Sequence, residues 1–188
     1  MPLVILDRDG VINEDSDAYI RNLEQWIPIP GSLEAIAKLS QAGCTIAIAT
    51  NQSGLARGYF SIAEMEKIHS KLNTLVEELG GQIDGIFYCP HLPDAKCNCR
   101  KPATGLLEAI EQDLKMSATG AHFVGDSLKD LQAAQRHGCL PVLVKTGKGL
   151  KTLECLANSN SDIQNPLDIP VYRDLAKASE AILTALKS

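Results

Sequence analysis

The strongest constraint on the fold of this chain is an alternation of short apolar runs with longer segments of helical periodicity. Five apolar runs are expected strands, and they cover residues 3–6, 45–50, 83–88, 122–126 and 141–147. Apolar residues recur at helical spacing in the segments 32–42, 61–79, 104–114 and 127–137. A weak strand at 169–172 and a helix at 174–186 complete the pattern. Such alternation requires right-handed crossovers, so the chain is predicted to form a parallel α/β sheet with helices on both faces.

The length of 188 residues suits one domain, so we expect residues 1–188 to form a single three-layer α/β/α sandwich with a Rossmann-like sheet. Lys and Arg number 18 against 23 Asp and Glu, a formal charge of −5 that argues against a nucleic-acid partner. No apolar run approaches the roughly 20 residues that cross a bilayer, so we expect a cytoplasmic protein with no membrane partner. The Asn- and Ser-rich segment 158–168 is predicted to be a mobile loop.

Polar residues follow the ends of several predicted strands. Asp7 and Asp9 come after the first strand, Thr50 ends the second, and Asp126 ends the fourth. Ligands of parallel α/β sheets bind beyond the carboxyl ends of the strands. These side chains are far apart in the sequence but are therefore expected to converge on one edge of the sheet.

Asp7 and Asp9 form the central pair of this predicted site. Two residues apart on an extended strand, they share a face, while Arg8 points away from it. Carboxylates this close repel each other unless a cation lies between them, and Mg²⁺ takes oxygen ligands. We predict that Asp7 attacks phosphorus as a nucleophile, that Asp9 is the general acid and base, and that both help to hold Mg²⁺, Asp9 through its backbone carbonyl. A solvated surface loop is the alternative interpretation of the pair taken alone.

The other strand ends offer groups that suit phosphoryl transfer. Thr50 and the backbone amides after it could hold a phosphoryl oxygen. Arg100 and Lys101 precede a predicted helix, where positive charge is unfavourable without a negative partner, and both bind phosphate well. Asp126 is predicted to be a further magnesium ligand. Asp130 fits a capping box at the start of the next helix, which explains it better than a role in the site.

The segment 89–99 has the pattern C-x-H-x5-C-x-C. Thiolates and an imidazole in a set of four are typical ligands of a structural Zn²⁺ site. The loop has few apolar residues that could fold it, and zinc would supply that stability. Three incidental thiols and a surface histidine are the alternative. We predict a zinc-binding loop whose four ligands are Cys89, His91, Cys97 and Cys99.

Taken in order, the motifs DxD, Thr, Lys and GDxxxD resemble the haloacid dehalogenase superfamily over nearly the whole chain. The resemblance implies a Mg²⁺-dependent phosphotransferase. Asp7 would be its nucleophile, Asp9 its acid and base, Thr50 and Lys101 its phosphoryl-stabilising residues, and Asp126 a metal ligand. Many members insert a cap domain after the first or third strand. This chain has no room for one, so we expect an open site and a monomer.

A narrower resemblance rests on the segments "DRDGVIN", "TNQSGLARG", "YCPH", "CNCRKP" and "VGDSLKD". Together they resemble the D,D-heptose 1,7-bisphosphate phosphatases, which are similar to the histidinol-phosphatase domain. The resemblance implies removal of the 7-phosphate from a heptose bisphosphate, on the path to lipopolysaccharide. It also implies substrate contacts from Asp15, Tyr19, Asn51, Gln52, Ser53, Arg100 and Ser127.

Two other functions remain open at this point. A histidinol-phosphate phosphatase would use the same chemistry, but its substrate calls for an acid near the amine, whereas a bisphosphate calls for cations near its second phosphate. Arg57 and Arg100, with Lys145 and Lys148 as weaker candidates, favour the bisphosphate. A zinc-stabilised binding module without activity would be expected to lack the nucleophile or a metal ligand, and this chain has both.

Overall fold

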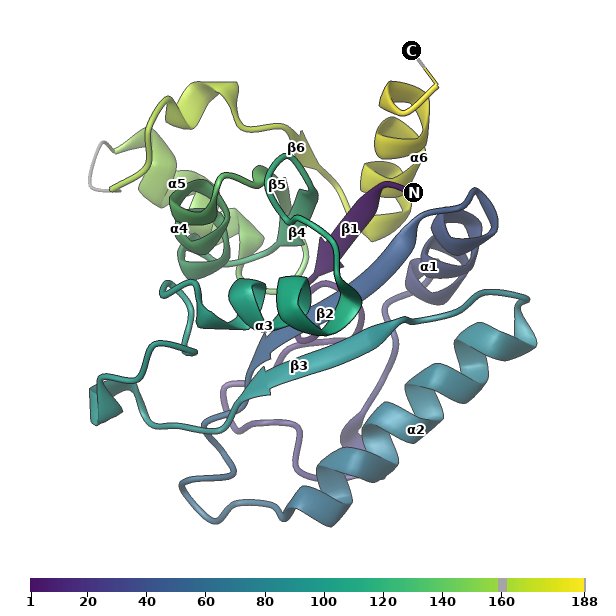
Figure 1. Cartoon of the computed structure of the whole chain (residues 1–188). Helices are drawn as coiled ribbons and strands as arrows, with labels where there is room; N and C mark the ends of the chain where they lie inside the picture. The colour runs from purple at the N-terminus through teal and green to yellow at the C-terminus, as the bar shows by residue number, and fades with distance from the viewer. Residues whose placement is uncertain (159–161, 188) are drawn as a thin grey trace.

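The computed structural model describes residues 1–158 and 162–187. Six strands form one sheet in the order β3-β2-β1-β4-β5-β6, and every neighbouring pair is parallel (Figure 1). The strands are β1 (Leu3–Leu6), β2 (Thr45–Asn51), β3 (Gly85–Cys89), β4 (His122–Gly125), β5 (Leu140–Val144) and β6 (Val171–Tyr172). Strands β2 and β3 therefore extend the sheet on one side of β1, and the chain then crosses to the other side of β1, where it forms β4, β5 and β6.

Six α-helices cover the two faces of the sheet (Figure 1). They are α1 (Ser32–Gln41), α2 (Ile62–Glu78), α3 (Gly105–Leu114), α4 (Leu128–His137), α5 (Gly149–Ala157) and α6 (Leu175–Ala185). Helices α1, α2 and α6 pack on one face, and α3, α4 and α5 pack on the other. The predicted three-layer α/β/α sandwich is confirmed.

The position of β1 in the middle of the sheet explains why its sequence is continuously apolar. Val4 and Leu6 face the core under α1, α2 and α6, whereas Leu3 and Ile5 face the core under α3 and α4. All four are buried, because a parallel strand in the middle of such a sheet has no solvent-facing side.

Two differences from the predicted elements have physical causes. Helix α5 was not predicted, because its nine residues are fewer than the window over which helical periodicity is usually recognised. Strand β5 ends at Val144, and the predicted extension to residue 147 is instead a loop that turns at Gly147 with φ +56°. That loop and α5 border the functional site described below.

The long connections contain little regular structure besides short 3₁₀ helices. These are η1 (Leu23–Gln25) after β1, η2 (Pro93–Ala95) after β3 and η3 (Pro166–Asp168) after α5. Within the described residues, the chain thus has no inserted cap domain. Residues 159–161 of the loop predicted to be mobile lie outside the described residues, while Ile163 in the same loop is buried against α4 and α5. Among the described helices, none combines the length and apolarity needed to cross a membrane.

Candidate active site

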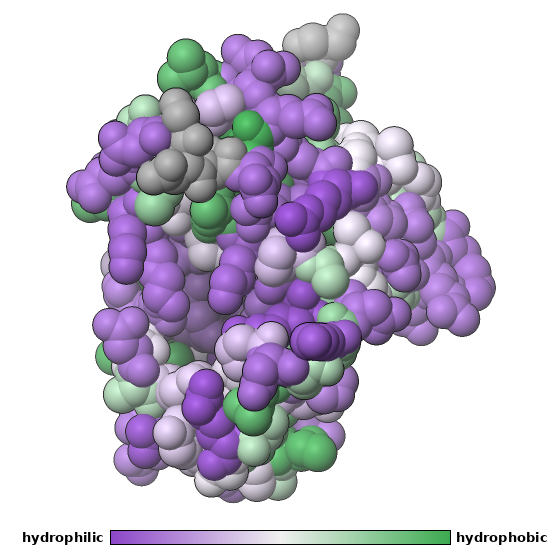
Figure 2. Space-filling view, turned by 90° about the vertical axis from the view of Figure 1, so that its left-hand side faces the viewer, coloured by the Kyte–Doolittle hydropathy of each residue, from purple (hydrophilic) through white to green (hydrophobic). Residues whose placement is uncertain are grey.

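The sheet reverses its direction of growth between β1 and β4, and Asp7 and Asp126 follow the ends of these two adjacent strands. A cavity of about 510 Å³ opens at this point, as expected for a parallel sheet. Figure 2 is turned toward this side of the molecule and shows a hollow bordered mainly by hydrophilic residues. Of the residues predicted to bind substrate or magnesium, those that line the cavity are Asp7, Asp9, Asp15, Tyr19, Thr50, Asn51, Gln52, Ser53, Arg100, Lys101, Asp126 and Ser127. Arg57 is not part of this lining.

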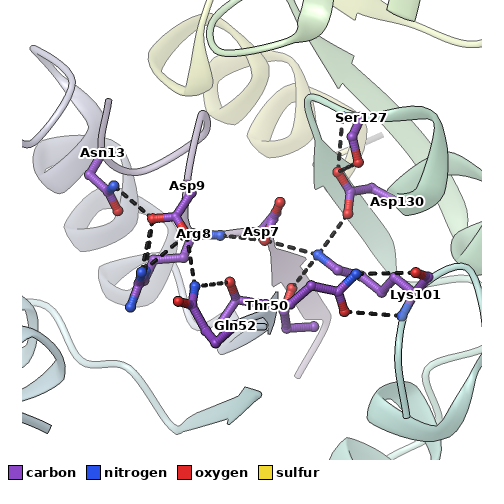
Figure 3. Close-up of polar contacts among 11 residues, drawn as sticks. Asp7, Arg8, Asp9, Asn13, Thr50, Gln52, Lys101, Ser127 and Asp130 are labelled. Carbon is purple, nitrogen blue, oxygen red and sulfur yellow. Dashed lines mark hydrogen bonds and ion pairs between the residues drawn. The ribbon is translucent and has the colours of Figure 1, made fainter. Parts of the chain in front are cut away.

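Lys101 lies at the centre of the buried charges (Figure 3). Its Nζ is 2.9 Å from Asp7 Oδ1 and 2.7 Å from Asp130 Oδ1, and it also donates to the Ala49 carbonyl at 2.7 Å. Only 2% of its side chain is exposed. Burial alone would lower the pKa of Lys101, but the charges of Asp130 and Asp7 raise it above its usual value, so the ammonium is permanently charged.

Asn51 fixes the backbone of Lys101. Its amide nitrogen donates to the Lys101 carbonyl at 3.1 Å, and its amide oxygen accepts from the Lys101 N–H at 3.1 Å. The end of β2 thereby holds the segment that follows the cysteine-rich loop. The Lys101 ammonium is thus positioned through its main chain as well as through its ion pairs.

Asp7 and Asp126 are surrounded by negative charge. Burial, followed by the charge of Asp130, raises the pKa of Asp7 to about 7 and that of Asp126 to about 8. Carboxylate oxygens of Asp7, Asp126 and Asp130 lie within 4.8 Å of one another. Lys101 and Ser127 engage both oxygens of Asp130, whereas the described contacts of Asp7 and Asp126 engage only one oxygen of each, so Asp7 and Asp126 offer the oxygens for a cation. Such a hard oxygen donor set fits Mg²⁺.

Asp9 has a different environment from Asp7. Its carboxylate accepts from Arg8 Nε and Nη2 at 3.1 Å each, from Asn13 Nδ2 at 2.9 Å and from Gln52 Nε2 at 2.7 Å (Figure 3). Burial opposes ionisation, but the Arg8 charge and the hydrogen bonds lower the pKa of Asp9. The carboxylate is thus ionised in the ligand-free protein, and its side chain stands apart from the group of three.

Arg8 points away from the cavity, as predicted, but it is neither exposed nor solvated. Its side chain is fully buried and is bound by Asp9 and by His69 of α2. Gln52 Nε2 also donates to Thr50 Oγ1 at 2.9 Å, so the hydroxyl predicted to hold a phosphoryl oxygen is itself held in place. Sequence reasoning did not detect this network, because it depends on contacts between β1, β2 and α2.

Asp130 also has a role that the sequence interpretation set aside. It caps α4 as predicted, since its Oδ2 accepts from the backbone and hydroxyl of Ser127 at 3.0 and 2.7 Å. Its other oxygen binds Lys101, so one side chain serves both functions. The sequence did carry one signal for this contact, because a base just before a helix is expected to have a negatively charged partner.

The outer part of the cavity is made by the segment that contains Asp15 and Tyr19. Asp15 Oδ2 is 3.1 Å from Lys148 Nζ, which joins this segment to the start of α5. Tyr19 has φ +66°, and its ring packs edge-on against Tyr59 with centroids 5.2 Å apart. A hydrogen bond with Ser53 and the nearby charge of Arg57 lower the pKa of Tyr19, so Arg57 lies close to this phenol although it does not line the cavity.

The cavity is lined by a partly different set of cations from the one predicted. Lys129, Lys148 and Lys151 line it together with Arg100, whereas Lys145 does not. Burial and the charges of Arg100 and Lys148 lower the pKa of Lys129, which indicates that these cations lie near one another. A second anionic group of a substrate would find compensation here.

The four predicted zinc ligands meet in the loop after β3. The Sγ atoms of Cys89, Cys97 and Cys99 are 3.0–3.7 Å apart, and His91 Nδ1 is 3.2 Å from Cys99 Sγ. Tetrahedral zinc with Zn–S bonds of about 2.3 Å separates sulfur ligands by about 3.8 Å, close to this arrangement. Arg100 Nη1 donates to the His91 carbonyl at 3.2 Å, which connects the cluster to the cavity.

Comparisons with known proteins agree with this geometry. A family profile described as "Polynucleotide kinase 3 phosphatase" matches residues 4–164. A D-glycero-beta-D-manno-heptose-1,7-bisphosphate 7-phosphatase of Pseudomonas aeruginosa is 59% identical over 181 residues, which are 96% of this chain and 97% of that protein. The protein of the same name from Pseudomonas putida is 60% identical over 154 residues, or 82% of this chain and 88% of that protein.

A solved structure extends the comparison to three dimensions. The crystal structure of D,D-heptose 1,7-bisphosphate phosphatase from B. bronchiseptica, complexed with magnesium and phosphate, matches with a TM-score of 0.90 and 47% identity. The match covers 98% of this chain and 99% of that one. This chain therefore belongs to the family of D-glycero-β-D-manno-heptose-1,7-bisphosphate 7-phosphatases within the haloacid dehalogenase superfamily, and it is a phosphoric monoester hydrolase.

Proposed function

We propose that this protein removes the 7-phosphate of D-glycero-β-D-manno-heptose 1,7-bisphosphate with Mg²⁺ as its cofactor. The observation that carries the proposal is the grouping of Asp7, Asp126 and Lys101 in a cavity whose mouth holds further cations. The names of the relatives support the substrate and its β anomer. The magnesium and phosphate bound by the B. bronchiseptica protein support the cofactor and the ester class.

The proposed reaction has two steps at Asp7. A carboxylate oxygen of Asp7 attacks phosphorus, the bond from phosphorus to the sugar oxygen breaks, and an aspartyl-phosphate forms. Asp9 donates a proton to the departing sugar oxygen. Asp9 then takes a proton from a water molecule, which attacks the phosphorus, releases inorganic phosphate and restores Asp7.

The protonation of Asp9 in the first step depends on the substrate. Asp9 is ionised in the ligand-free protein because Arg8, Asn13 and Gln52 stabilise its charge. A phosphate that enters the cavity brings negative charge close to this carboxylate, which raises its proton affinity. Arrival of the substrate therefore prepares Asp9 to act as an acid.

Charge on the phosphoryl group is compensated from several directions. Lys101 and Thr50 are positioned to hold phosphoryl oxygens during transfer. Mg²⁺ held by Asp7, Asp126 and the Asp9 backbone carbonyl would neutralise part of the charge that develops on these oxygens. Asp130 also binds the Lys101 ammonium at 2.7 Å, which keeps it in place.

The second phosphate of the substrate accounts for the cations at the mouth. Arg100, Lys129 and Lys148 line the cavity and suit the 1-phosphate. A histidinol phosphate would instead need an acid for its amine. Asp15 and Asp17 also line the cavity, but the cations Arg100, Lys129, Lys148 and Lys151 outnumber them, so the bisphosphate is the better match.

We also propose that Cys89, His91, Cys97 and Cys99 bind a structural Zn²⁺ ion. Arg100 and Lys101 follow the last ligand directly. A metal in this loop would therefore hold Arg100, which we propose contacts the substrate, close to Lys101, which we propose stabilises the phosphoryl group. We further propose that residues 1–188 act as a single capless domain, as a monomer in the cytoplasm, in the supply of heptose for lipopolysaccharide.

A substrate panel tests the proposed function. With Mg²⁺ present, phosphate release would be measured from both anomers of heptose 1,7-bisphosphate, fructose 1,6-bisphosphate, histidinol phosphate and an oligonucleotide 3′-phosphate. We expect a strong preference for the β-heptose bisphosphate. Preference for histidinol phosphate or the oligonucleotide would overturn the substrate and leave the enzyme class intact.

The Asp7→Asn variant is the control for that panel and tests the nucleophile. The amide has nearly the same shape as the carboxylate but cannot attack phosphorus, so turnover should fall by at least about 10⁴-fold while the fold is kept. Circular dichroism and thermal unfolding would verify the fold. Appreciable residual turnover would remove Asp7 from this role.

A further inference from the structure

Arg8 separates the two catalytic aspartates in the sequence, and it is the bulkiest of the fully buried side chains among the described residues. A guanidinium carries a permanent charge and five N–H donors, so its burial requires acceptors close by. Two side chains meet this requirement, Asp9 and His69. Arg8 therefore connects a catalytic carboxylate with a histidine on helix α2.

The contact between Arg8 and Asp9 fixes an orientation. Nε donates to Oδ1 and Nη2 to Oδ2 at 3.1 Å each, and Nη2 also lies 3.0 Å from Oδ1, so the guanidinium contacts both carboxylate oxygens (Figure 3). Asn13 and Gln52 bind the same two oxygens from other sides. The Asp9 carboxylate can turn only if the guanidinium turns with it.

The contact between Arg8 and His69 holds the other end of the guanidinium. Arg8 Nη1 lies 3.2 Å from His69 Nε2. Arginine has no acceptor atom, so Nε2 must accept and the ring proton must lie on Nδ1. Burial, with the Arg8 charge as the next cause, lowers the pKa of His69 to about 4, so the ring is neutral near pH 7. The Tyr88 ring of β3 flanks it with centroids 6.2 Å apart.

We infer that His69 is a positioning residue of the phosphatase reaction, which accepts from Arg8 and so holds the guanidinium that orients Asp9. The inference rests on the proposed role of Asp9 as general acid and base. His69 is not among the described residues that line the cavity, so it acts through Arg8 and not on the substrate. Its loss should affect the rate of proton transfer more than the affinity for substrate.

Two substitutions of His69 separate positioning from packing. His69→Leu removes the acceptor, whereas His69→Gln keeps an acceptor oxygen near the place of Nε2. We expect kcat of His69→Leu to fall between about 10- and 100-fold with KM nearly unchanged, and His69→Gln to recover most of the rate. His122→Leu is the matched control, because His122 is a half-buried histidine at the start of β4, at the opposite end of the sheet.

The dependence on leaving group is the readout that a packing defect would not change. A sugar oxygen needs a proton from Asp9 to depart, whereas 4-nitrophenolate departs readily without one. In single-turnover experiments, His69→Leu should therefore slow the sugar phosphate more than 4-nitrophenyl phosphate. Equal losses with both substrates, or an equal loss in His122→Leu, would overturn the inference.

The tautomer of His69 gives a test that does not depend on activity. Nitrogen-15 NMR of the histidine-labelled protein should show the His69 proton on Nδ1, with the signal assigned by its absence in His69→Gln. A proton on Nε2 would overturn the inference whatever the kinetics. If the wild-type protein hydrolyses a different phosphate ester in place of the heptose bisphosphate, the proposed substrate fails, and His69 is tested with that ester.

Discussion

The carboxylate of Asp126 is surrounded by backbone more than by side chains. Gly10, with φ +84°, and Gly147, with φ +56°, both lie against it, and a Cβ atom on either glycine would overlap Asp126 Oδ2. The Lys148 N–H donates to the same oxygen at 2.7 Å, and Thr146 Oγ1 joins the two loops by donating to the Gly10 carbonyl at 2.7 Å. The space around this proposed metal ligand exists only because two distant positions lack side chains.

Gly10→Ala tests this arrangement. The methyl group would displace the Asp126 carboxylate, so we expect weaker Mg²⁺ binding as well as a loss of stability. Gly43→Ala is the matched control, because Gly43 has φ +87° with open space around it. In that variant the free energy of unfolding should fall only by the cost of a left-handed backbone at a residue with a Cβ atom, which is roughly 1–2 kcal/mol. Calorimetric titration with Mg²⁺ checks the difference, and equal magnesium affinity in the two variants would contradict the argument.

Single residues also show where sequence reasoning stops. Asp7, Lys101 and Asp126 could be predicted because each follows a strand or precedes a helix in a recognisable motif. The role of Asp130 could not, because a capping box explains it locally while its ion pair with Lys101 depends on tertiary packing. A local explanation that is correct can therefore hide a second function.

At the scale of elements, the loop after β3 has to be ordered without a core of its own. Cys89 at the end of the strand is buried, whereas Cys97 and Cys99 are half-buried and His91 is exposed. The loop ends at Lys101, which is among the most buried charged groups of the described residues. A metal bound to the four side chains would connect a solvated loop to the buried ammonium of Lys101.

Cys97→Ser tests the metal in this loop. A hydroxyl is a poor zinc ligand, so we expect the zinc content to fall and the unfolding temperature to drop by roughly 4–8 °C, which corresponds to about 2 kcal/mol for a chain of this length. Cys44→Ala is the control, since Cys44 is buried away from the cluster. Atomic absorption and calorimetry make the measurements. A zinc-free Cys97→Ser protein with wild-type stability would show that the loop needs no metal.

The elements themselves were predictable to different degrees. Helix α2 has a capping box and a long apolar face, and the structure places it at Ile62–Glu78, almost as expected. Helix α5 escaped prediction, since its nine residues are fewer than the window over which helical periodicity is recognised. The missed helix supplies Lys151 and Thr152 to the cavity, so a short element concealed part of the site.

For the whole molecule, the important quantity is the net charge of the buried side chains at the carboxyl ends of the central strands. Asp7, Asp126 and Asp130 bring three carboxylates together against the single ammonium of Lys101. The deficit equals the charge of one divalent cation. Without that cation, the two carboxylates with raised pKa values hold protons into the neutral range.

Stability without magnesium should therefore depend on pH. The pKa values of about 7 for Asp7 and about 8 for Asp126 lie above the unfolded value of 3.8, so the folded state binds more protons between these limits. Its stabilisation is complete below about pH 4 and is lost as the pH rises through 7 and 8. We expect the unfolding temperature to fall between about pH 6 and pH 9, and the stabilisation by added Mg²⁺ to grow over the same range.

Scanning calorimetry of protein dialysed without chelator, with and without Mg²⁺, makes this measurement and leaves the cysteine loop undisturbed. Asp126→Asn is the control variant, because it lacks the group with the higher pKa. Its magnesium-free stability should change less with pH. A wild-type protein whose response to Mg²⁺ is the same at pH 6 and pH 9 would contradict the charge argument.

The convergence of the site was predictable because it follows from the architecture. Parallel strands bring their carboxyl ends to one edge, so residues 7, 50 and 126 must meet wherever the sheet order makes β1, β2 and β4 neighbours. The outer cavity was less predictable, since it depends on loops such as the one that places Tyr19 against Tyr59. No periodic rule governs such contacts.

The double hydrogen bond between Asn51 and Lys101 has a consequence for the ageing of the protein. Thiolates are the groups most readily attacked by peroxides, and their oxidation would release a bound metal and loosen the loop. Lys101 would stay in place, because Asn51 and Asp130 hold it independently of the cysteines. The Arg100 side chain is held by the His91 carbonyl alone among its described hydrogen bonds and would be freed. An oxidised population should therefore discriminate poorly between phosphate esters long before it stops hydrolysing them.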